Sequence, residues 1–197
     1  MLKNSYPKNL AIFASGEGTN FSALVHYFKK TNLPLKVKLL ICDHQKANVL
    51  NRSKKELIPT FVINFKKYSN KIISEKIILK KLKKEKINFI ILAGYMRIIG
   101  PTILSKYEGK IINIHPALLP HFPGKTGIKD AFNAKAKNTG VTVHWVDKGI
   151  DTGEIIAQRK VPIYKNDNLE KLTQRIHHTE HKLYPETVQY LFQKGEI

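Results

Sequence analysis

The hydrophobic and polar positions of this chain follow two alternating patterns. Short apolar runs rich in β-branched residues, such as residues 87–92, are typical of strands that are buried on both faces of a sheet. Between the runs, apolar residues recur every three or four positions, as at Phe21, Leu24 and Phe28, which indicates helices with one buried face. The apolar runs predict strands at residues 10–14, 37–42, 60–63, 87–92, 110–115, 141–146 and 154–161.

The helical periodicity predicts which faces are buried and how the elements connect. A helix begins after Thr19 or Asn20, either of which is a suitable N-cap, and the last helix contains Pro185, where we expect a bend. In the helix over residues 69–86 the isoleucines face inward and the lysines outward, so that Ile72, Ile73, Ile77, Ile78 and Leu82 are expected inside. The further helices are expected at residues 46–55, 125–136 and 168–193.

This alternation of strands and helices indicates an α/β fold with a doubly wound, mostly parallel sheet and helices on both faces. The last two strands are joined without an obvious helix, so we expect an antiparallel edge at the C-terminal end of the sheet. At 197 residues the chain is long enough for a full hydrophobic core, and we expect residues 1–197 to form a single domain.

Composition excludes several classes of protein. The single cysteine, Cys42, allows no intrachain disulfide, which fits a reducing cytosol, and its apolar neighbours predict a buried and inert thiol. Residues 1–6 lack the apolar stretch of a secretory signal, and residues 87–104 are interrupted by Asn88 and Arg97. We therefore expect a cytoplasmic protein with no membrane partner.

The net charge of +19 raises the question of a nucleic-acid partner. Arginine is scarce, and the lysines are scattered over predicted helical surfaces without interleaved aromatic residues, which favours biased codon usage over a nucleic-acid site. A general attraction for anionic substrates remains under either interpretation.

A glycine-rich turn follows the first predicted strand. Gly18, Thr19 and Asn20 stand between this strand and a helix, where backbone N–H groups and the helix dipole favour a phosphate. The third glycine of the dinucleotide fingerprint is replaced by Phe21, and no Walker lysine is present. The turn predicts a monophosphate site, with a purely structural turn as the alternative.

The residues with the clearest chemistry surround a strand that ends at Pro116. Asn113 and His115 are two positions apart, so both side chains leave the same face of that strand at its carboxyl end, where open α/β sheets place ligands. Asp151 lies in a glycine-rich loop later in the chain, between Gly149 and Gly153. The pattern predicts an active site, although a histidine at a strand end can be a core residue and Asp-Thr-Gly is also turn chemistry.

Several segments together closely resemble the phosphoribosylglycinamide formyltransferase family, folate-dependent enzymes of purine synthesis with a Rossmann-like formyltransferase fold. The resemblance runs from about residue 10 to residue 190, in the order and spacing of that family. It is carried by Ser-Gly-Glu-Gly-Thr-Asn at 15–20, Ala-Gly-Tyr-Met-Arg-Ile at 93–98, Asn-Ile-His-Pro-Ala-Leu-Leu-Pro at 113–120, Gly-Val-Thr-Val-His at 140–144 and Asp-Thr-Gly at 151–153.

The resemblance implies transfer of a formyl group from 10-formyltetrahydrofolate to the amino group of glycinamide ribonucleotide, with no metal. Asn113, His115 and Asp151 match the catalytic trio of the family, and Gly18, Thr19 and Asn20 match its substrate-phosphate loop. Glu180 matches a carboxylate that contacts the ribonucleotide. The folate site of the family corresponds to Met96, Arg97, Ile98, Ile99, Val146, Asp147 and Asp151. The chain departs from the family at Ala117, where a serine is usual, and near Thr126, where histidine or asparagine is frequent; the second departure bears on local substrate contacts.

The chemistry of the trio suits this reaction. The amide of Asn113 and a protonated His115 can stabilise the negative oxygen of a tetrahedral intermediate, and Asp151 can keep His115 charged or orient a water that carries a proton. No nucleophilic serine or cysteine is indicated, so we expect direct transfer. His144 either orients the trio from behind or is a satisfied interior histidine.

Other readings stay open at this point. His177 and His181 have the spacing of metal ligands on a helix, but no further ligand motif accompanies them, so a solvated helix face is favoured. The rival functions are a formyltransferase of initiator methionyl-tRNA, which carries an additional C-terminal domain, a formyltetrahydrofolate hydrolase, which carries an N-terminal one, and a basic nucleic-acid-binding domain. The sequence leaves open whether the protein is a monomer or a homodimer.

Overall fold

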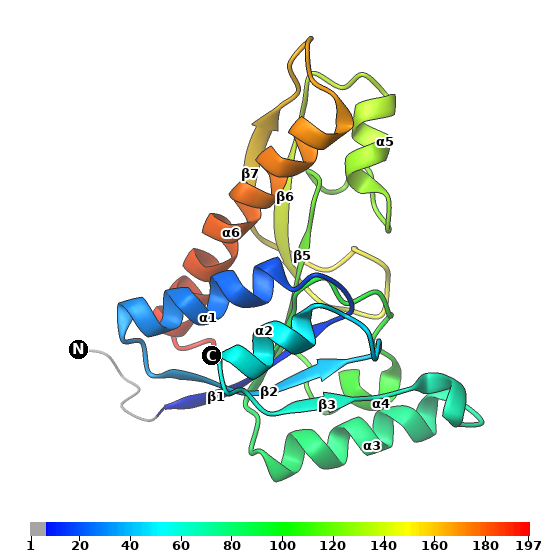
Figure 1. Cartoon of the computed structure of the whole chain (residues 1–197), viewed down its shortest axis with the longest axis vertical. Helices are drawn as coiled ribbons and strands as arrows, with labels where there is room; N and C mark the ends of the chain where they lie inside the picture. Colours follow the sequence, from blue (N-terminus) through cyan, green and yellow to red (C-terminus); the bar gives the residue numbers. More distant parts are fainter. Residues whose placement is uncertain (1–6) are drawn as a thin grey trace.

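The computed structural model describes residues 7–197, in which seven strands form one mixed sheet in the order β3-β2-β1-β4-β5-β6-β7 (Figure 1). The strands β1 to β5 run parallel to one another, whereas β6 is antiparallel to both β5 and β7. The α/β class, the mostly parallel sheet and the antiparallel C-terminal edge are thus confirmed. The strands are β1 (Lys8–Ala14), β2 (Leu35–Cys42), β3 (Thr60–Val62), β4 (Phe89–Leu92), β5 (Ile111–His115), β6 (Asn138–Trp145) and β7 (Ile155–Pro162).

Helices cover both faces of this sheet. In Figure 1, α1 and α2 lie on one side of β1 and β2, and α3 and α4 lie on the other. Each face has its own buried cluster, one built around residues such as Phe21 and Tyr184, the other around Ile78 and Ile103. The helices are α1 (Thr19–Thr31), α2 (Val49–Lys55), α3 (Lys71–Lys84), α4 (Pro101–Leu104), α5 (Gly127–Asn133) and α6 (Leu169–Lys194), with a 3-10 turn η1 (Phe65–Lys67).

The expected inner face of α3 is wrong at its start. Ile72 and Ile73 are 54% and 40% exposed, whereas Ser74 and Glu75 are buried. A carboxylate oxygen of Glu75 accepts a hydrogen bond from the backbone N–H of Gly100, 2.6 Å away. This bond orients the first turn of α3. A buried carboxylate without a hydrogen-bond partner costs more free energy than an isoleucine that is partly exposed to solvent.

The predicted helix limits also need correction at two places. Residues 45–48 form a turn, in which the N–H of Ala47 donates to the carbonyl of His44, so α2 is shorter than expected. The helix α5 ends early because Lys135 has a φ of 51°, which is incompatible with a right-handed helix. The short helix α4, which begins with Pro101 in its first turn, is below the length at which hydrophobic periodicity is visible.

The strand order creates the place where a ligand binds in this class of fold. The chain builds the sheet outward from β1 through β2 to β3 on one side and from β4 through β5 on the other, which makes the carboxyl ends of β1 and β4 the topological switch point. The fully buried Tyr184 of α6 fixes this end of the sheet, because its hydroxyl lies 2.9 Å from the carbonyl oxygen of Leu92 and 3.3 Å from that of Ile112.

Candidate active site

A cavity of about 660 Å³ lies at this end of the sheet, and all the site residues predicted from the sequence line it. Its walls come from the loops that follow β1, β4 and β5, from the loop between β6 and β7, and from α6. The predicted residues on its surface are Gly18, Thr19, Asn20, Met96, Arg97, Ile98, Ile99, Asn113, His115, His144, Val146, Asp147, Asp151 and Glu180.

Asn113, His115 and Asp151 meet at one end of the cavity. The pairing of β5 with β6 places Asn113 directly opposite His144, and the amide nitrogen of Asn113 lies 3.2 Å from Nε2 of His144. The same amide nitrogen donates to Oδ1 of Asp151 at 3.4 Å, which is a long and therefore weak hydrogen bond. Nδ1 of His144 donates to the carbonyl oxygen of Trp145 at 2.8 Å, which fixes the orientation of the ring.

Both ring nitrogens of His115 have partners. Nε2 lies 2.7 Å from the carbonyl oxygen of Phe122, which can only accept, so this nitrogen carries a proton. Nδ1 lies 3.4 Å from Oδ2 of Asp151. An ionised carboxylate also only accepts hydrogen bonds. Nδ1 can therefore donate to Asp151 only when His115 is a doubly protonated, positively charged imidazolium.

Asp151 is held as an anion by its surroundings. Its side chain is only 12% exposed, and this burial by itself would raise its pKa. The interaction with His144, the hydrogen bond from the N–H of Gly124 at 2.8 Å and the nearby His115 outweigh that effect and lower the pKa of Asp151. Its ionised form therefore stabilises the fold above the unfolded value of about 4, and this contribution is lost as the pH falls through the lower folded pKa.

The backbone of the loop that carries Asp151 is shaped by a second carboxylate. Asp147 accepts hydrogen bonds from the N–H of Gly149 at 2.9 Å and from the hydroxyl of Thr152 at 2.8 Å. Asp151 itself has a φ of 55°, in the left-handed region that aspartate and asparagine tolerate better than most residues. The carboxylate of Asp147 thus closes its own loop, although the residue also lines the cavity.

Gly127 leaves space for His115. A Cβ atom at residue 127 would stand 2.9 Å from the carbonyl oxygen of Phe122 and 3.1 Å from Nε2 of His115. We expect Gly127→Ala to lower kcat by about tenfold or more, because it displaces the imidazole and the carbonyl that holds it. Steady-state kinetics test this expectation, and a parallel measurement of the free energy of unfolding separates the loss of activity from a loss of fold. Unchanged kcat in a folded variant would show that the placement of His115 is not critical.

The glycine-rich turn presents the free end of a helix to the cavity. Gly18 is the N-cap of α1, has a φ of 73° and provides no side-chain cap, so N–H groups of the first turn of α1 remain free of a capping side chain. A Cβ atom at Gly18 would lie 2.5 Å from Cγ2 of Val49, so the close approach of α2 requires glycine there. The N–H of Val49 donates to the carbonyl of Gly16 at 3.1 Å, which fixes the turn.

Glu180 connects α1 to α6 at the same end of the cavity. Its Oε2 accepts from the amide of Asn20 at 3.2 Å and from Nδ1 of His177 at 2.8 Å. Both Asn20 and Glu180 are buried, and Oδ1 of Asn20 has no partner within the described part of the protein. A buried and unpaired amide oxygen at a cavity wall is typical of a residue that completes its hydrogen bonds with a ligand.

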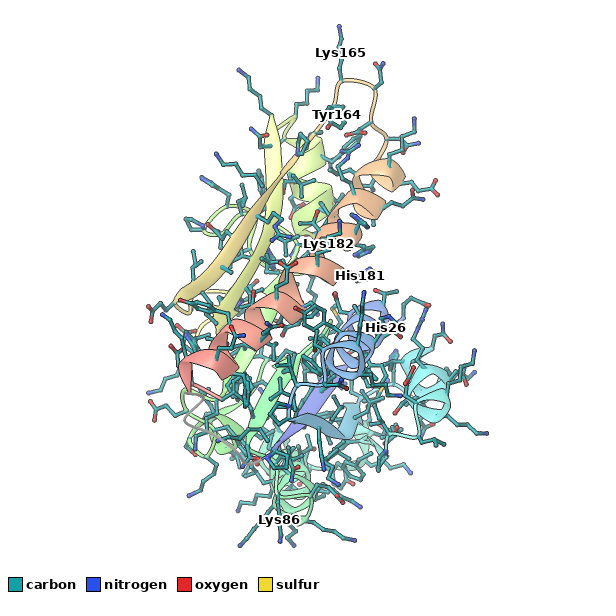
Figure 2. The ribbon with its side chains drawn as sticks, turned by 90° about the vertical axis from the view of Figure 1, so that its left-hand side faces the viewer. His26, Lys86, Tyr164, Lys165, His181 and Lys182 are labelled. Carbon is teal, nitrogen blue, oxygen red and sulfur yellow. The ribbon has the colours of Figure 1, made fainter. Side chains whose placement is uncertain are left out.

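The side chain of His177 is 45% exposed, as expected for a solvated helix face, but this face borders the cavity. His177 lines the cavity, and the hydrogen bond to Glu180 raises its pKa despite partial burial. The ring of His181 stacks beside it with centroids 6.4 Å apart, and burial lowers the pKa of His181. His181 lies on α6 beside α1 (Figure 2). The spacing of the two histidines suggested only a metal site or a surface face. The sequence did not reveal this cluster because Glu180, the partner of His177, is itself bonded to Asn20, which is 160 residues away along the chain.

Two residues that line the cavity were not predicted from the sequence. Gly124 and Lys125 also line the cavity, from a loop whose conformation includes a φ of 55° at Phe122.

Within residues 7–197, no group of three or more His, Cys, Asp or Glu side chains is arranged to hold a metal ion. Nor does any helix of the described part have the length and apolar content needed to cross a membrane.

A family model described as formyl transferase matches residues 8–188. The chain belongs to the formyl transferase family. Membership of this family implies a formylated folate as the co-substrate.

Relatives of this formyl transferase are similar over nearly its whole length. Phosphoribosylglycinamide formyltransferase of Bacillus subtilis is 48% identical over 184 residues, which are 93% of this chain and 94% of that protein. Glycinamide ribonucleotide transformylase 1 of Geobacillus kaustophilus has a solved structure with 53% identity and a TM-score of 0.92, covering 95% of this chain and 100% of that one. The human trifunctional purine biosynthetic protein adenosine-3 is 34% identical over 180 residues, which are 91% of this chain and 18% of that protein.

The positive charge of this formyl transferase is spread over the molecule. Figure 2 shows Lys86 at one end of the long axis, Lys165 at the other and Lys182 between them. The side chains that line the cavity are mixed in charge, with Lys125, Arg97 and His177 balanced by Asp151 and Glu180.

Proposed function

We propose that this chain transfers the formyl group of 10-formyltetrahydrofolate to the amino group of glycinamide ribonucleotide, a step of purine synthesis that yields formylglycinamide ribonucleotide and tetrahydrofolate. The observation that carries the proposal is a single cavity with a helix N-terminus at one end and the trio of Asn113, His115 and Asp151 beside it. The relatives named for this activity cover the same length of chain.

The residues at the reacting end suit an attack by an amine on a formyl carbon. As the new C–N bond forms, negative charge develops on the formyl oxygen, and the amide of Asn113 can exchange its long hydrogen bond to Asp151 for one to this oxygen. When both its nitrogens are protonated, His115 places a positive charge beside that oxygen, and the hydrogen bond from Nε2–H to the carbonyl of Phe122 holds the ring there. Each such donor contributes about 2.7–4 kcal/mol of transition-state stabilisation.

Asp151 completes the proton balance. The attacking amine must lose a proton and the leaving nitrogen of the folate must gain one when the old C–N bond breaks. An anionic Asp151, held by Gly124 and the two histidines, can take the proton from the amine and pass it to the leaving nitrogen, either directly or through a water that it orients. No covalent enzyme intermediate and no metal are needed for these steps.

The two ligands are assigned to the two parts of the cavity wall. The ribonucleotide phosphate is placed at Gly18, Thr19 and Asn20, with Glu180 toward the sugar, because N–H groups of a helix N-terminus attract a phosphate. The folate is placed along Met96 to Ile99 and Val146 to Asp151, where Met96 and Ile98 expose 55% and 53% of their area. Such half-exposed apolar residues at a cavity mouth suit a flat aromatic ligand.

The same features bear on the domain organisation, the compartment and the oligomeric state. We infer one formyltransferase domain that acts in the cytoplasm on small molecules, without nucleic acid, as a monomer or a homodimer. Cys42 is buried and free, and burial raises the pKa of its thiol, so it neither needs an oxidising compartment nor offers a reactive thiolate.

The first test is turnover. The purified chain is mixed with 10-formyltetrahydrofolate and glycinamide ribonucleotide, and the absorbance change of the folate is followed. Loss of the formyl group that requires the ribonucleotide would support the proposal. Loss without the ribonucleotide would indicate a hydrolase, and no loss would favour the methionyl-tRNA or nucleic-acid alternatives.

A substitution in the glycine-rich turn tests the phosphate position. We expect Thr19→Asp to weaken ribonucleotide binding by about tenfold or more, because it places a negative charge beside the phosphate, while folate binding stays within about twofold. Calorimetric titration with each ligand measures both constants. Thr31→Asp, which adds the same charge at the other end of α1, is the matched control. Equal loss of both ligands in the Thr19 variant would contradict the assignment.

A further inference from the structure

The cavity wall formed by residues 93–100 is fastened to the rest of the protein at several points by polar groups. The N–H of Ser15 donates to the carbonyl of Gly94 at 3.0 Å, and the hydroxyl of Ser15 accepts from the N–H of Met96 at 2.9 Å. At the far end the N–H of Gly100 donates to the buried Glu75 at 2.6 Å. A Cβ atom at Gly100 would stand 2.5 Å from the carboxylate of Glu75, so the fit at this point is close.

Arg97 is held between these points by Asp43. Its Nε lies 2.6 Å from Oδ2 of Asp43, and its guanidinium lies over the ring of Phe65, 4.2 Å from the centroid. The Asp43 side chain is 7% exposed and that of Arg97 is 40% exposed, so the aspartate is the fixed partner and the arginine reaches toward the cavity. The hydrogen bond to Asp43 is made by Nε of the guanidinium.

Asp43 does not itself line the cavity, yet its position determines where Arg97 can lie. It follows β2 directly, on the neighbouring strand to β1, so its backbone is set by the rigid centre of the sheet. A free arginine side chain loses rotamer entropy when it is immobilised by a ligand. An arginine that is already held by a buried carboxylate and an aromatic ring has lost most of that freedom before the ligand arrives.

We propose that Asp43 is a positioning residue for the folate, which acts by holding Arg97 in its binding orientation on the wall formed by residues 93–100. The inference rests on the proposed function, because it takes the ligand of this wall to be the folate. Asp43 then contributes to folate affinity without touching the ligand. It makes no contribution to the affinity for the ribonucleotide, whose site begins at Gly18.

The test is Asp43→Asn, which keeps the shape of the side chain and removes its charge. We expect the Kd for tetrahydrofolate and the KM for 10-formyltetrahydrofolate to rise about tenfold, with the KM for the ribonucleotide within about twofold and kcat at saturation within about threefold. Asp167→Asn is the matched control, because Asp167 is another buried carboxylate paired with an arginine, Arg175, and neither residue lines the cavity. We expect this control to leave all four constants unchanged.

A double-mutant cycle shows whether the effect passes through Arg97. In the background of Arg97→Met, the change Asp43→Asn should raise the Kd for tetrahydrofolate by less than about twofold. A further tenfold rise in that background, or an equal rise of both KM values in Asp43→Asn, would overturn the proposal. Thermal unfolding shows whether each variant is folded. If Asp43→Asn is not folded, Asp43→Ser is measured in its place. Tetrahydrofolate binding is measured without the ribonucleotide, so a failure of the proposed reaction would not be mistaken for a failure of this inference.

Discussion

Replacement of Asp151 by asparagine is expected to reduce kcat by about 10²–10⁴-fold, the range over which general acid–base groups contribute. The variant keeps the size of the side chain and accepts the left-handed backbone at φ 55°, but it can no longer exchange a proton or stabilise a charged His115. Rapid-mixing or steady-state kinetics at saturating concentrations of both substrates measure the change.

The control for this variant must share its electrostatic setting. Asp167 suits this purpose, because hydrogen bonds from Arg175 also lower its pKa, to about 2. Asp167→Asn should retain normal kcat. Thermal unfolding of both variants above pH 5 reveals any loss of stability from the missing charge. Near-normal turnover by a folded Asp151→Asn variant would remove Asp151 from the mechanism.

Replacement of Asn113 by alanine is expected to lower kcat by about 10²–10³-fold with both KM values changed by less than about threefold. The amide of Asn113 donates most strongly to an oxygen that becomes negative in the transition state, so its loss affects the reaction more than the binding of either substrate. Steady-state kinetics with each substrate varied in turn measure the split between kcat and KM.

The opposite split would assign a different role to Asn113. A large rise in KM with kcat retained would indicate that the amide binds a substrate and does not stabilise an intermediate. The variant also removes the contact with Nε2 of His144, so a second variant that affects only that ring is needed. His144→Gln, which retains a hydrogen-bonding side chain, should cost less in kcat than Asn113→Ala if the amide is the direct donor.

Much of the fold could be predicted from the sequence, because the strands that determine it are buried on both faces. A run such as Phe89–Leu92 is continuous and apolar, so its state and its central place in the sheet follow from hydrophobicity alone. The start of α3 could not be predicted in the same way. Burial of Glu75 in place of Ile72 depends on a hydrogen bond to Gly100, 25 residues away, and no local pattern carries that information.

The site shows the same division. Spacing on one strand and a turn motif bring Asn113, His115 and Asp151 to one edge of a sheet, and the structure places them together. The partners that orient them are mainly backbone groups, such as the carbonyl of Phe122 and the N–H of Gly124. Backbone groups exist at every residue, so sequence offers no signal for which of them will face a side chain.

The spread of lysines along the whole molecule has a consequence for how substrates arrive. Charges at both ends of the long axis attract an anion from every direction, so the two anionic ligands are drawn to the protein but not guided toward one opening. Added salt shortens the reach of this attraction to about 8 Å at physiological ionic strength. The encounter rate of the enzyme with either ligand should therefore decline with salt by similar proportions, while the chemical step inside the cavity keeps its rate.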